Sequence, residues 1–254
     1  MAVQGNSGSH QIAHDWVYEG VKKPGQWSLK SGGGQQSPVR IDASADSSSP
    51  EPITTCYKAA PAKVKYKYPA LEYYPRHAGE WGYLEIGCER WNLVKIHAHA
   101  KAEHSLFCHD RYGTPLLPAE IHFVHTRADS PGDRFLVLGV FARGSEDGEQ
   151  PVVLPFLDHL RSGQYELTTD GLVLSADIAL CPGCLLPGKR DYYSYQGSLT
   201  TPPCTENVDF LLLEQTIPVR RSQLEEFDEL FPGCTNRPIQ PSPDLEVRRN
   251  ERHR

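Results

Sequence analysis

The chain lacks any long hydrophobic run. None of its 254 residues lies in a stretch approaching the roughly 18 to 20 apolar residues that a membrane-spanning helix needs, so we expect no membrane span. The N-terminus also lacks the apolar stretch of a signal peptide. The chain as given is therefore expected to be cytoplasmic, or secreted if a signal peptide has been removed.

An excess of positive charge is also absent. The formal net charge of −6 gives no reason to expect nucleic acid as a partner. Hydrophobic residues make up 39% and charged residues 23%, which is typical of a globular protein, and the length fits one large domain or two small ones. We expect the basic stretch from Arg248 to Arg254 to be a frayed, solvated end.

A recognisable cysteine framework is missing. The chain has seven cysteines, an odd number, and in a chain of this length their spacing predicts no disulfide pairing. Cys181 and Cys184 form a Cys-Pro-Gly-Cys pair, which invites a redox or a zinc interpretation. A second such pair and a thioredoxin-like βαβ pattern are both absent, so a loop pair without either role is favoured.

The first fifty residues are rich in Gly, Ser and Pro. After them, apolar and polar residues alternate. A period of two residues predicts strands, here at 63–68, 93–99, 121–125, 135–141 and 208–213. The run at 135–141 is nearly all apolar, which suits a strand that is covered on both faces.

Helical signals are fewer. Ser222 and Glu225 form a capping box ahead of an apolar pattern at helical spacing, and Gly233 follows its end. Residues 153–160 are a second amphipathic candidate. One sheet-centred domain with peripheral helices is the simplest prediction.

Histidines gather in two of the predicted strands. His97 and His99 lie two residues apart, so on a strand both side chains project from the same face, about 7 Å apart along the chain. That spacing lets two imidazoles converge on one metal ion. A neighbouring strand can supply a third ligand, His122 or His125, but not both, because residues three apart on a strand face opposite sides.

Glu120 favours His122, because it shares a face with that residue and can accept its other ring N–H. An isolated His-x-His pair is more often solvated than metal-bound, and His104 and His125 are expected to be structural. Three histidines without a carboxylate or thiolate ligand suit a catalytic zinc site, in which a fourth position stays open for water.

Several motifs together resemble a known family. They are Gln36-Ser37-Pro38-Val39, His97-x-His99, Glu103-His104, Glu120-Ile121-His122-Phe123-Val124-His125, Gly197-Ser198-Leu199-Thr200-Thr201-Pro202-Pro203-Cys204 and Asn236-Arg237-Pro238-Ile239-Gln240-Pro241, with Trp16-x-Tyr18 and Trp27 near the N-terminus. In order and approximate spacing the set resembles the alpha-carbonic anhydrases. The resemblance implies a mixed α/β, mainly β domain at 14–248 around a twisted, mostly antiparallel central sheet with short peripheral helices. A loosely ordered N-terminus at 1–13 and a basic tail at 249–254 would flank it.

The resemblance also implies a function, the zinc-dependent reversible hydration of carbon dioxide to bicarbonate and a proton by attack of zinc-bound hydroxide. Thr200 would accept a hydrogen bond from the hydroxide and donate one to Glu103, while Thr201 would help to place bicarbonate. Anions or sulfonamides would inhibit by binding at the zinc. The implied zinc ligands are His97, His99 and His122.

Outer parts of the site are implied in the same way. Tyr18 would join a water network, and Ser37 and Tyr195 would form hydrogen bonds around the ligands. A dry pocket suits carbon dioxide, which is small and apolar and needs the strong nucleophile that zinc generates by lowering the pKa of its bound water. The residues at the pocket positions are Val124, Val137, Leu199 and Val208.

The sequence departs from the family pattern beside the ligands. Lys95 stands where the family usually has a glutamine that accepts the N–H of the first zinc histidine, and a charged lysine only donates. His77 is the nearest candidate for the family's proton-shuttle histidine, although the segment after it is shorter than the family pattern. A solvated loop histidine is the competing interpretation of His77.

Two departures lie further away. The stretch at 105–118 is longer than usual and is expected to form an extended hairpin loop that exposes His109, a remote shuttle candidate. Cys204 matches one half of a disulfide of secreted family members, but the partner position near Ser31 holds no cysteine.

Two other functions compete with the enzyme. A catalytically weak or silent binding protein on the same scaffold usually lacks one or more zinc histidines, which are all present here, and Lys95 is the main point in its favour. Hydrolysis of small activated esters is expected only as a side reaction of the same site.

Overall fold

The computed structural model describes residues 34–42, 51–67, 70–112, 116–155, 165–168, 171–174, 178–201, 203–230, 235–242 and 245–250. Tyr18 and the other N-terminal aromatic residues lie outside these ranges, as does Ser31. The segments predicted as strands lie in or overlap β3 (Ala60–Lys67), β6 (Glu89–Ala100), β8 (Ala119–Arg127), β9 (Phe135–Gly144) and β14 (Glu206–Leu213), which confirms the period-two prediction.

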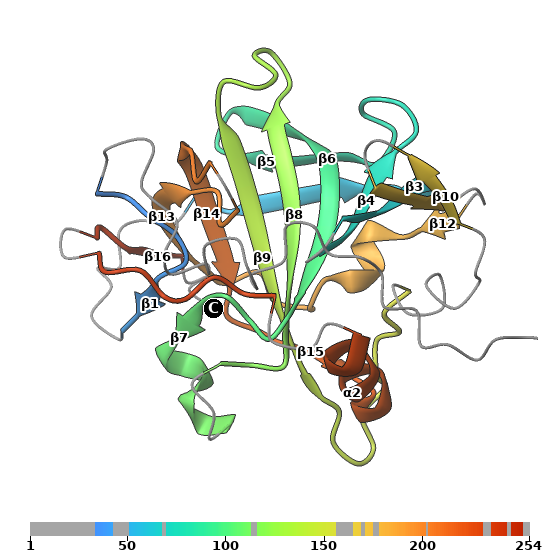
Figure 1. Cartoon of the computed structure of the whole chain (residues 1–254). Coiled ribbons are helices and arrows are strands. Elements are labelled where there is room, and N and C mark those ends of the chain that lie inside the picture. The colour runs from blue at the N-terminus through green and yellow to red at the C-terminus, as the bar shows by residue number, and fades with distance from the viewer. Residues whose placement is uncertain are drawn as a thin grey trace, which may run out of the picture.

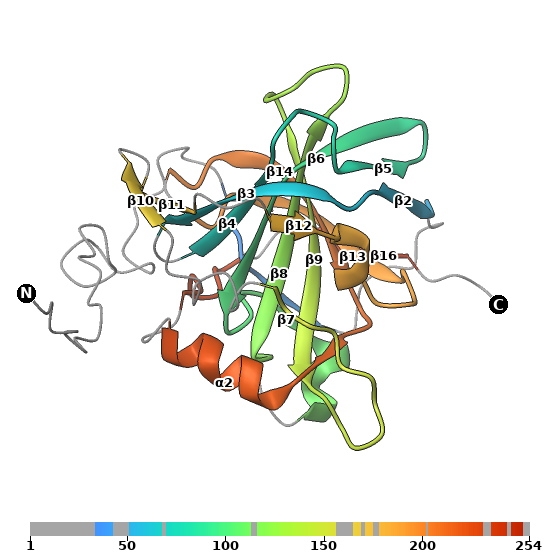
Figure 2. The same ribbon diagram turned by 90° about the vertical axis from the view of Figure 1, so that its right-hand side faces the viewer.

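These strands belong to one twisted, 14-stranded sheet (Figures 1 and 2). Its main path runs β10 (Tyr165–Thr168), β11 (Gly171–Leu174), β3, β4 (Ala70–Pro75), β6, β8, β9, β14, β13 (Tyr192–Ser198) and β16 (Arg248–Asn250). Most neighbours are antiparallel, but β9 pairs in parallel with β14 and with β15 (Ile217–Val219). The expected fold class is confirmed, with a mixed sheet.

Smaller elements flank the main path. β12 (Ile178–Leu180) pairs with β3, and β5 (Gly82–Ile86) pairs with β2 (Ile53–Tyr57) and β6. A separate parallel pair joins β1 (Arg40–Ile41) to β7 (Ser105–Leu106), and two short 3-10 helices are η2 (Phe107–Tyr112) and η3 (Pro182–Leu185). α2 (Arg221–Leu230) lies at the lower end of the sheet in Figure 1. Within the described ranges, no helix has the length and apolar character to cross a membrane.

The central strands are apolar on both faces because each face packs against its own core. On β9, Leu136, Leu138 and Val140 belong to one buried cluster. Val137 and Phe141, which alternate with them, belong to a second cluster on the other face. This confirms the prediction that the strand at 135–141 is covered on both sides.

Expectations about the helices are corrected in part. α2 forms, but it begins at Arg221, so Ser222 lies in the first turn rather than at the cap. The amides of Gln223 and Leu224 donate to the carbonyl of Arg220 instead. Residues 153–155 are not helical, while 156–160 and Gly233 lie outside the described ranges.

One peripheral expectation is confirmed and another is wrong. The segment at 105–118 joins the antiparallel strands β6 and β8 as a long hairpin connection, which contains β7 and η2, and residues 113–115 lie outside the described ranges. Arg248–Asn250 is not frayed, because it pairs as β16 with Tyr192–Ser194, and Arg249 binds the carboxylate of Glu214 at 2.7 Å.

Candidate metal centre

Three histidine rings from two adjacent strands converge on one point. His97 and His99 project from the same face of β6, and the antiparallel register places His122 of β8 opposite His97. The ring centroids of the three pairs are 5.0, 5.1 and 4.8 Å apart, and one nitrogen of each ring lies within 4.8 Å of the others. All three rings are buried. The sheet register therefore adds a third ring to the pair that the sequence spacing indicates.

His125 does not join this group. Its side chain lies on the other face of β8, where Nε2 accepts a hydrogen bond from the Tyr57 hydroxyl at 2.7 Å and Nδ1 donates to the carbonyl of Leu136 at 3.0 Å. Burial lowers the pKa of His125 to about 4, so the ring is neutral near pH 7. His125 is thus a structural residue, as expected.

Hydrogen bonds behind two of the rings decide which nitrogen faces the common point. His122 donates from Nε2 to Oε1 of Glu120 at 2.7 Å, which leaves Nδ1 for a metal. His99 donates from Nδ1 to the carbonyl of Thr235 at 3.1 Å, and its Nε2 is buried with no hydrogen-bond partner among the described residues. Such outer partners hold a histidine in the ligating tautomer, so both rings fit a bound cation.

His97 lacks an outer partner of this kind. Its Nδ1 is buried and has no hydrogen-bond partner in the part of the chain that the structure describes. Lys95, two residues earlier, donates its ammonium to Oε1 of Glu72 at 2.8 Å, and the Tyr74 hydroxyl donates to Oε2 of Glu72 at 2.6 Å. The acceptor that the sequence lacks at position 95 is therefore not replaced by another described side chain.

The pKa shifts of two of the three rings suit a metal as well. Burial, and then the charge of Lys95, hold the pKa of His97 well below its ordinary value, and burial also lowers the pKa of His99. Burial acts in the same direction on His122, but the charge of Glu120 and the hydrogen bond to it outweigh burial and raise the pKa of that ring. Neutral imidazoles offer the lone pairs that a divalent cation needs.

Glu120 also holds the segment that follows β6. Burial acts to raise its pKa, but electrostatic attraction to His104 and His122 and hydrogen bonds from them hold that pKa well below the ordinary value. Oε1 of Glu120 accepts from Nδ1 of His104 at 2.8 Å, and Oε2 accepts the amides of Glu103 and His104 at 2.8 and 2.9 Å. His104, Glu120 and His122 already bond to one another, so their grouping is a hydrogen-bond chain rather than a second metal site.

The hydrogen-bond chain of Glu120 and His104 continues to Tyr195 and Ser37, the two residues that were expected to form hydrogen bonds around the ligands. Nε2 of His104 lies 2.6 Å from the Tyr195 hydroxyl, which in turn lies 2.8 Å from Oγ of Ser37. Because Nδ1 of His104 donates to Glu120, Nε2 is left to accept from Tyr195. Burial holds the pKa of Tyr195 well above its ordinary value, so this hydroxyl stays protonated.

Glu103 lies beside the rings with one oxygen unused. Oε1 accepts the amide of Arg237 at 2.9 Å. Oε2 is buried without a hydrogen-bond partner among the described residues and lies 3.4 Å from Nε2 of His99. The bond from Thr200 to Glu103 that the resemblance implies is therefore not formed here, although Thr200 is buried directly beyond the end of β13. Thr201 is half-buried next to it.

An apolar cluster borders the rings. Val124 follows His122 by two residues on β8, so it shares the face of that ring, and Val137 stands opposite Val124 in the β8–β9 register. The ring of Phe210 lies 6.1 Å from that of His122. The expected pocket residues therefore gather on one side of the site, and the cluster includes Val124, Val137 and Val208, with Leu199 packed against it.

Arg237 and Gln36 support the site from outside, and both stand in the motifs of the resemblance, although the sequence by itself indicates no role for them. Arg237 is buried and donates to the amide oxygen of Gln36 at 3.0 Å and to the carbonyl of Ser37 at 2.6 Å. Gln36 donates to the carbonyl of Cys204 at 3.3 Å. Together they tie the loop of Thr200 to Glu103.

The two shuttle candidates lie in different surroundings. His77 is exposed in the turn after β4, and because Glu72 is the β4 residue opposite His97, the strand runs roughly 10 Å further before it ends at Pro75. His109 is buried rather than exposed, with its ring against Phe141 and its Nε2 donating to the carbonyl of Glu214 at 2.9 Å. The expectation of exposure for His109 is therefore wrong.

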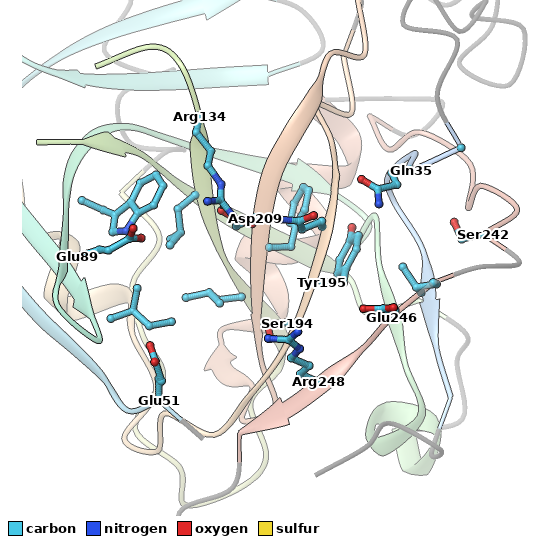
Figure 3. Close-up of a pocket in the computed structure, with 18 of the residues that line it drawn as sticks. Gln35, Glu51, Glu89, Arg134, Ser194, Tyr195, Asp209, Ser242, Glu246 and Arg248 are labelled. Atoms are coloured by element: carbon cyan, nitrogen blue, oxygen red, sulfur yellow. Dashed lines mark hydrogen bonds and ion pairs between the residues drawn. The ribbon is translucent and has the colours of Figure 1, made fainter. Parts of the chain in front are cut away.

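A cavity of about 960 Å³ lies elsewhere on the molecule (Figure 3). Arg134 and Asp209 form an ion pair in it, with 2.6 Å between Nε and Oδ2. Trp91 and Leu136, which also line it, belong to the core on the sheet face away from Val137. None of the three histidines lines this cavity, but Tyr195 and Phe210, which lie beside the histidine group, are part of its wall.

Comparisons with known proteins agree with this geometry. The family model of eukaryotic-type carbonic anhydrases matches residues 22–253. Carbonic anhydrase 3 of Bos taurus is 27% identical over 250 residues, which are 91% of this chain and 92% of that protein. A hyperthermostable carbonic anhydrase from an active hydrothermal vent chimney has a TM-score of 0.73 at 28% identity, covering 93% of this chain and 100% of that one. The alpha-carbonic anhydrase of Thermovibrio ammonificans, solved with the inhibitor sulfanilamide, has a TM-score of 0.69 at 27% identity, covering 93% and 99%.

Proposed function

The chain belongs to the eukaryotic-type carbonic anhydrase family, and from this premise we propose that it catalyses the zinc-dependent reversible hydration of carbon dioxide to bicarbonate and a proton. One observation carries the proposal. Three buried imidazoles converge on one point, and two of them, His99 and His122, are anchored through the ring nitrogen that faces away from it. Three neutral nitrogen ligands with a fourth position for water are typical of catalytic zinc.

Zinc held by these rings supplies a water activated for attack at neutral pH. Thr200 would accept the hydrogen of the attacking oxygen and donate its own to Oε2 of Glu103. That oxygen supports the role, because it is buried beside the rings with no hydrogen-bond partner among the described residues. Arg237 keeps Glu103 in place through its backbone amide. Thr201 helps to place bicarbonate, and Tyr18, outside the described ranges, joins the water network.

The apolar cluster beside His122 receives carbon dioxide. A small apolar substrate gains from a dry surface next to the nucleophile, and burial of Val124, Val137 and Val208 provides one. Sulfonamides and inorganic anions are expected to compete at the zinc, because the related enzyme of Thermovibrio ammonificans was solved with sulfanilamide.

The test combines zinc content with stopped-flow hydration of carbon dioxide, with and without a sulfonamide. We expect near-stoichiometric zinc and sulfonamide-sensitive hydration. His99→Ala should lose zinc and activity together, whereas Thr200→Ala should keep zinc and lose about 100-fold or more in rate, the typical effect of removing one transition-state hydrogen bond. A chain that binds no zinc, or a Thr200→Ala variant with unchanged turnover, contradicts these assignments.

A catalytically silent binding protein is the second candidate. The observation in its favour is the pair formed by Lys95 and Glu72, which leaves Nδ1 of His97 without an acceptor among the described residues. Full zinc occupancy without measurable hydration would select this candidate over the enzyme.

A further inference from the structure

The Cys-Pro-Gly-Cys segment is closed by a disulfide that the metal centre does not use. Cys181 and Cys184 are bonded across η3, with their Cα atoms 5.4 Å apart. Cys184 is exposed and Cys181 is half-buried. The segment follows β12, which lies beside β3 at the right of Figure 1, and in the order of the sheet β3 and β4 stand between β12 and the histidine-bearing β6.

The backbone around this disulfide is held in place by other interactions. Pro182 and Leu185 are buried, and Leu185 and Leu180 belong to the main hydrophobic core. β12 pairs with β3 directly before the segment, and the amide of Cys184 donates to the carbonyl of Cys181 at 3.1 Å. The covalent ring spans few residues, so it restricts the unfolded chain less than a long loop does. The two sulfurs therefore stay close together when the bond between them is broken.

The exposure of Cys184 and the anchored backbone support a redox interpretation of the Cys-Pro-Gly-Cys segment, which the sequence pattern by itself did not favour. An exchange site needs one sulfur that a second molecule can reach and a backbone that keeps the other sulfur in position for closure. Exposure of Cys184 meets the first condition, and the anchoring of Pro182 and Leu185 meets the second.

We propose that Cys181 and Cys184 form a thiol–disulfide exchange site, which a dithiol reductant opens and an oxidised thiol closes without unfolding the chain. One thiolate of the dithiol attacks Sγ of Cys184 and bonds to it. The bond between the two cysteines breaks, and its electron pair leaves on Sγ of Cys181, which takes up a proton. The second thiolate of the dithiol then attacks the dithiol's first sulfur, which is bonded to Cys184. The bond to Cys184 breaks, and Cys184 takes up a proton and leaves as a thiol. The dithiol becomes a disulfide, and the protein gains two electrons and two protons.

The first test uses the full-length folded chain with dithiothreitol as the dithiol, N-ethylmaleimide as the trap and peptide mapping by mass spectrometry. Two other cysteines serve as internal controls, because neither forms a disulfide. Cys88 is exposed and should be labelled with or without reductant. Cys204 is fully buried, and burial raises the pKa of its thiol, so its labelling reports unfolding.

We expect reductant to expose Cys181 and Cys184 to labelling within minutes while Cys204 stays unlabelled, and oxidised glutathione to restore the bond. Labelling of the pair only when Cys204 is labelled as well would overturn the proposal, since reduction would then require unfolding. Thiols at 181 and 184 that oxidised glutathione does not close would also overturn it. Zinc content and hydration activity play no part in this readout, so it is independent of the proposed enzymatic function.

A second test asks which sulfur is attacked. Cys181→Ser leaves Cys184 as the single cysteine of the pair, and Cys184→Ser leaves Cys181. With oxidised glutathione, we expect the mixed disulfide to form about tenfold faster at Cys184 than at Cys181, because thiol reactivity follows access. Equal or reversed rates would overturn the assignment of Cys184. The label on Cys204 shows whether either variant is folded, and the wild-type experiment does not depend on them.

Discussion

In the Lys95→Gln variant we expect zinc to bind about 10- to 100-fold more tightly than in the wild-type chain. Nδ1 of His97 is buried without a hydrogen-bond partner among the described residues, two residues from the Lys95 side chain. A glutamine at this position offers a carbonyl oxygen that accepts from the ring. Its amide nitrogen can still donate to Glu72, which now accepts from Lys95 at 2.8 Å.

The magnitude follows from one hydrogen bond to a metal-binding histidine. Loss of such an outer partner typically costs 10- to 100-fold in affinity, which corresponds to about 1.4–2.7 kcal/mol. Removal of the Lys95 ammonium also strengthens zinc binding, because its positive charge disfavours a cation at His97. Burial is the largest cause of the lowered pKa of His97, and the charge of Lys95 is the second largest. Glu72 offsets much of that charge, since its carboxylate lies 2.8 Å from Nζ.

Lys95→Met is the matched control, because it removes the charge and adds no acceptor. Zinc dissociation constants are measured by competition with a chelator of known affinity, and circular dichroism checks the fold of each variant. We expect the Lys95→Gln variant to bind zinc most tightly, the Lys95→Met variant less tightly and the wild-type chain least tightly. Equal affinities for the glutamine and methionine variants would refute the reasoning, because the added acceptor would then contribute nothing.

Two further predictions concern stability. Gly197→Ala should destabilise the fold by about 1–3 kcal/mol in chemical denaturation, because an added Cβ would lie 2.1 Å from Oγ of Ser37 and 2.7 Å from the Tyr195 ring. Gly188→Ala is its control, since the atom nearest to a Cβ there is 3.8 Å away, and equal losses in both variants would contradict the clash. Lowering the pH should destabilise the metal-free chain through His125, whose pKa of about 4 lies below the value of about 6.5 in the unfolded chain. The unfolded chain then binds the extra proton between those values, so stability falls as the pH drops through this window, by up to about 1.4 kcal/mol per pH unit. His125→Gln should flatten that slope in denaturant titrations, and an unchanged slope would show that His125 is not the source.

Local sequence patterns determined much of the fold. Alternation placed the central strands, because side chains two apart share a face wherever a strand lies. The same rule predicted that His97 and His99 project together and that His122 and His125 do not. It also paired Glu120 with His122, as their 2.7 Å hydrogen bond shows. These inferences needed only neighbours in the chain.

Contacts between distant segments required the tertiary structure. The bond from the amide of Arg237 to Glu103 spans 134 residues, and that from Gln36 to the carbonyl of Cys204 spans 168. Burial of His109, pairing of Arg248–Asn250 and closure of Cys181 with Cys184 were likewise decided there. Periodicity predicts which face a side chain takes, but strand register and loop packing decide what it meets. For that reason the strands and the Glu120–His122 pair could be predicted from the sequence, whereas the Thr235 carbonyl behind His99 and the pairing of Lys95 with Glu72 became assignable only in the folded chain.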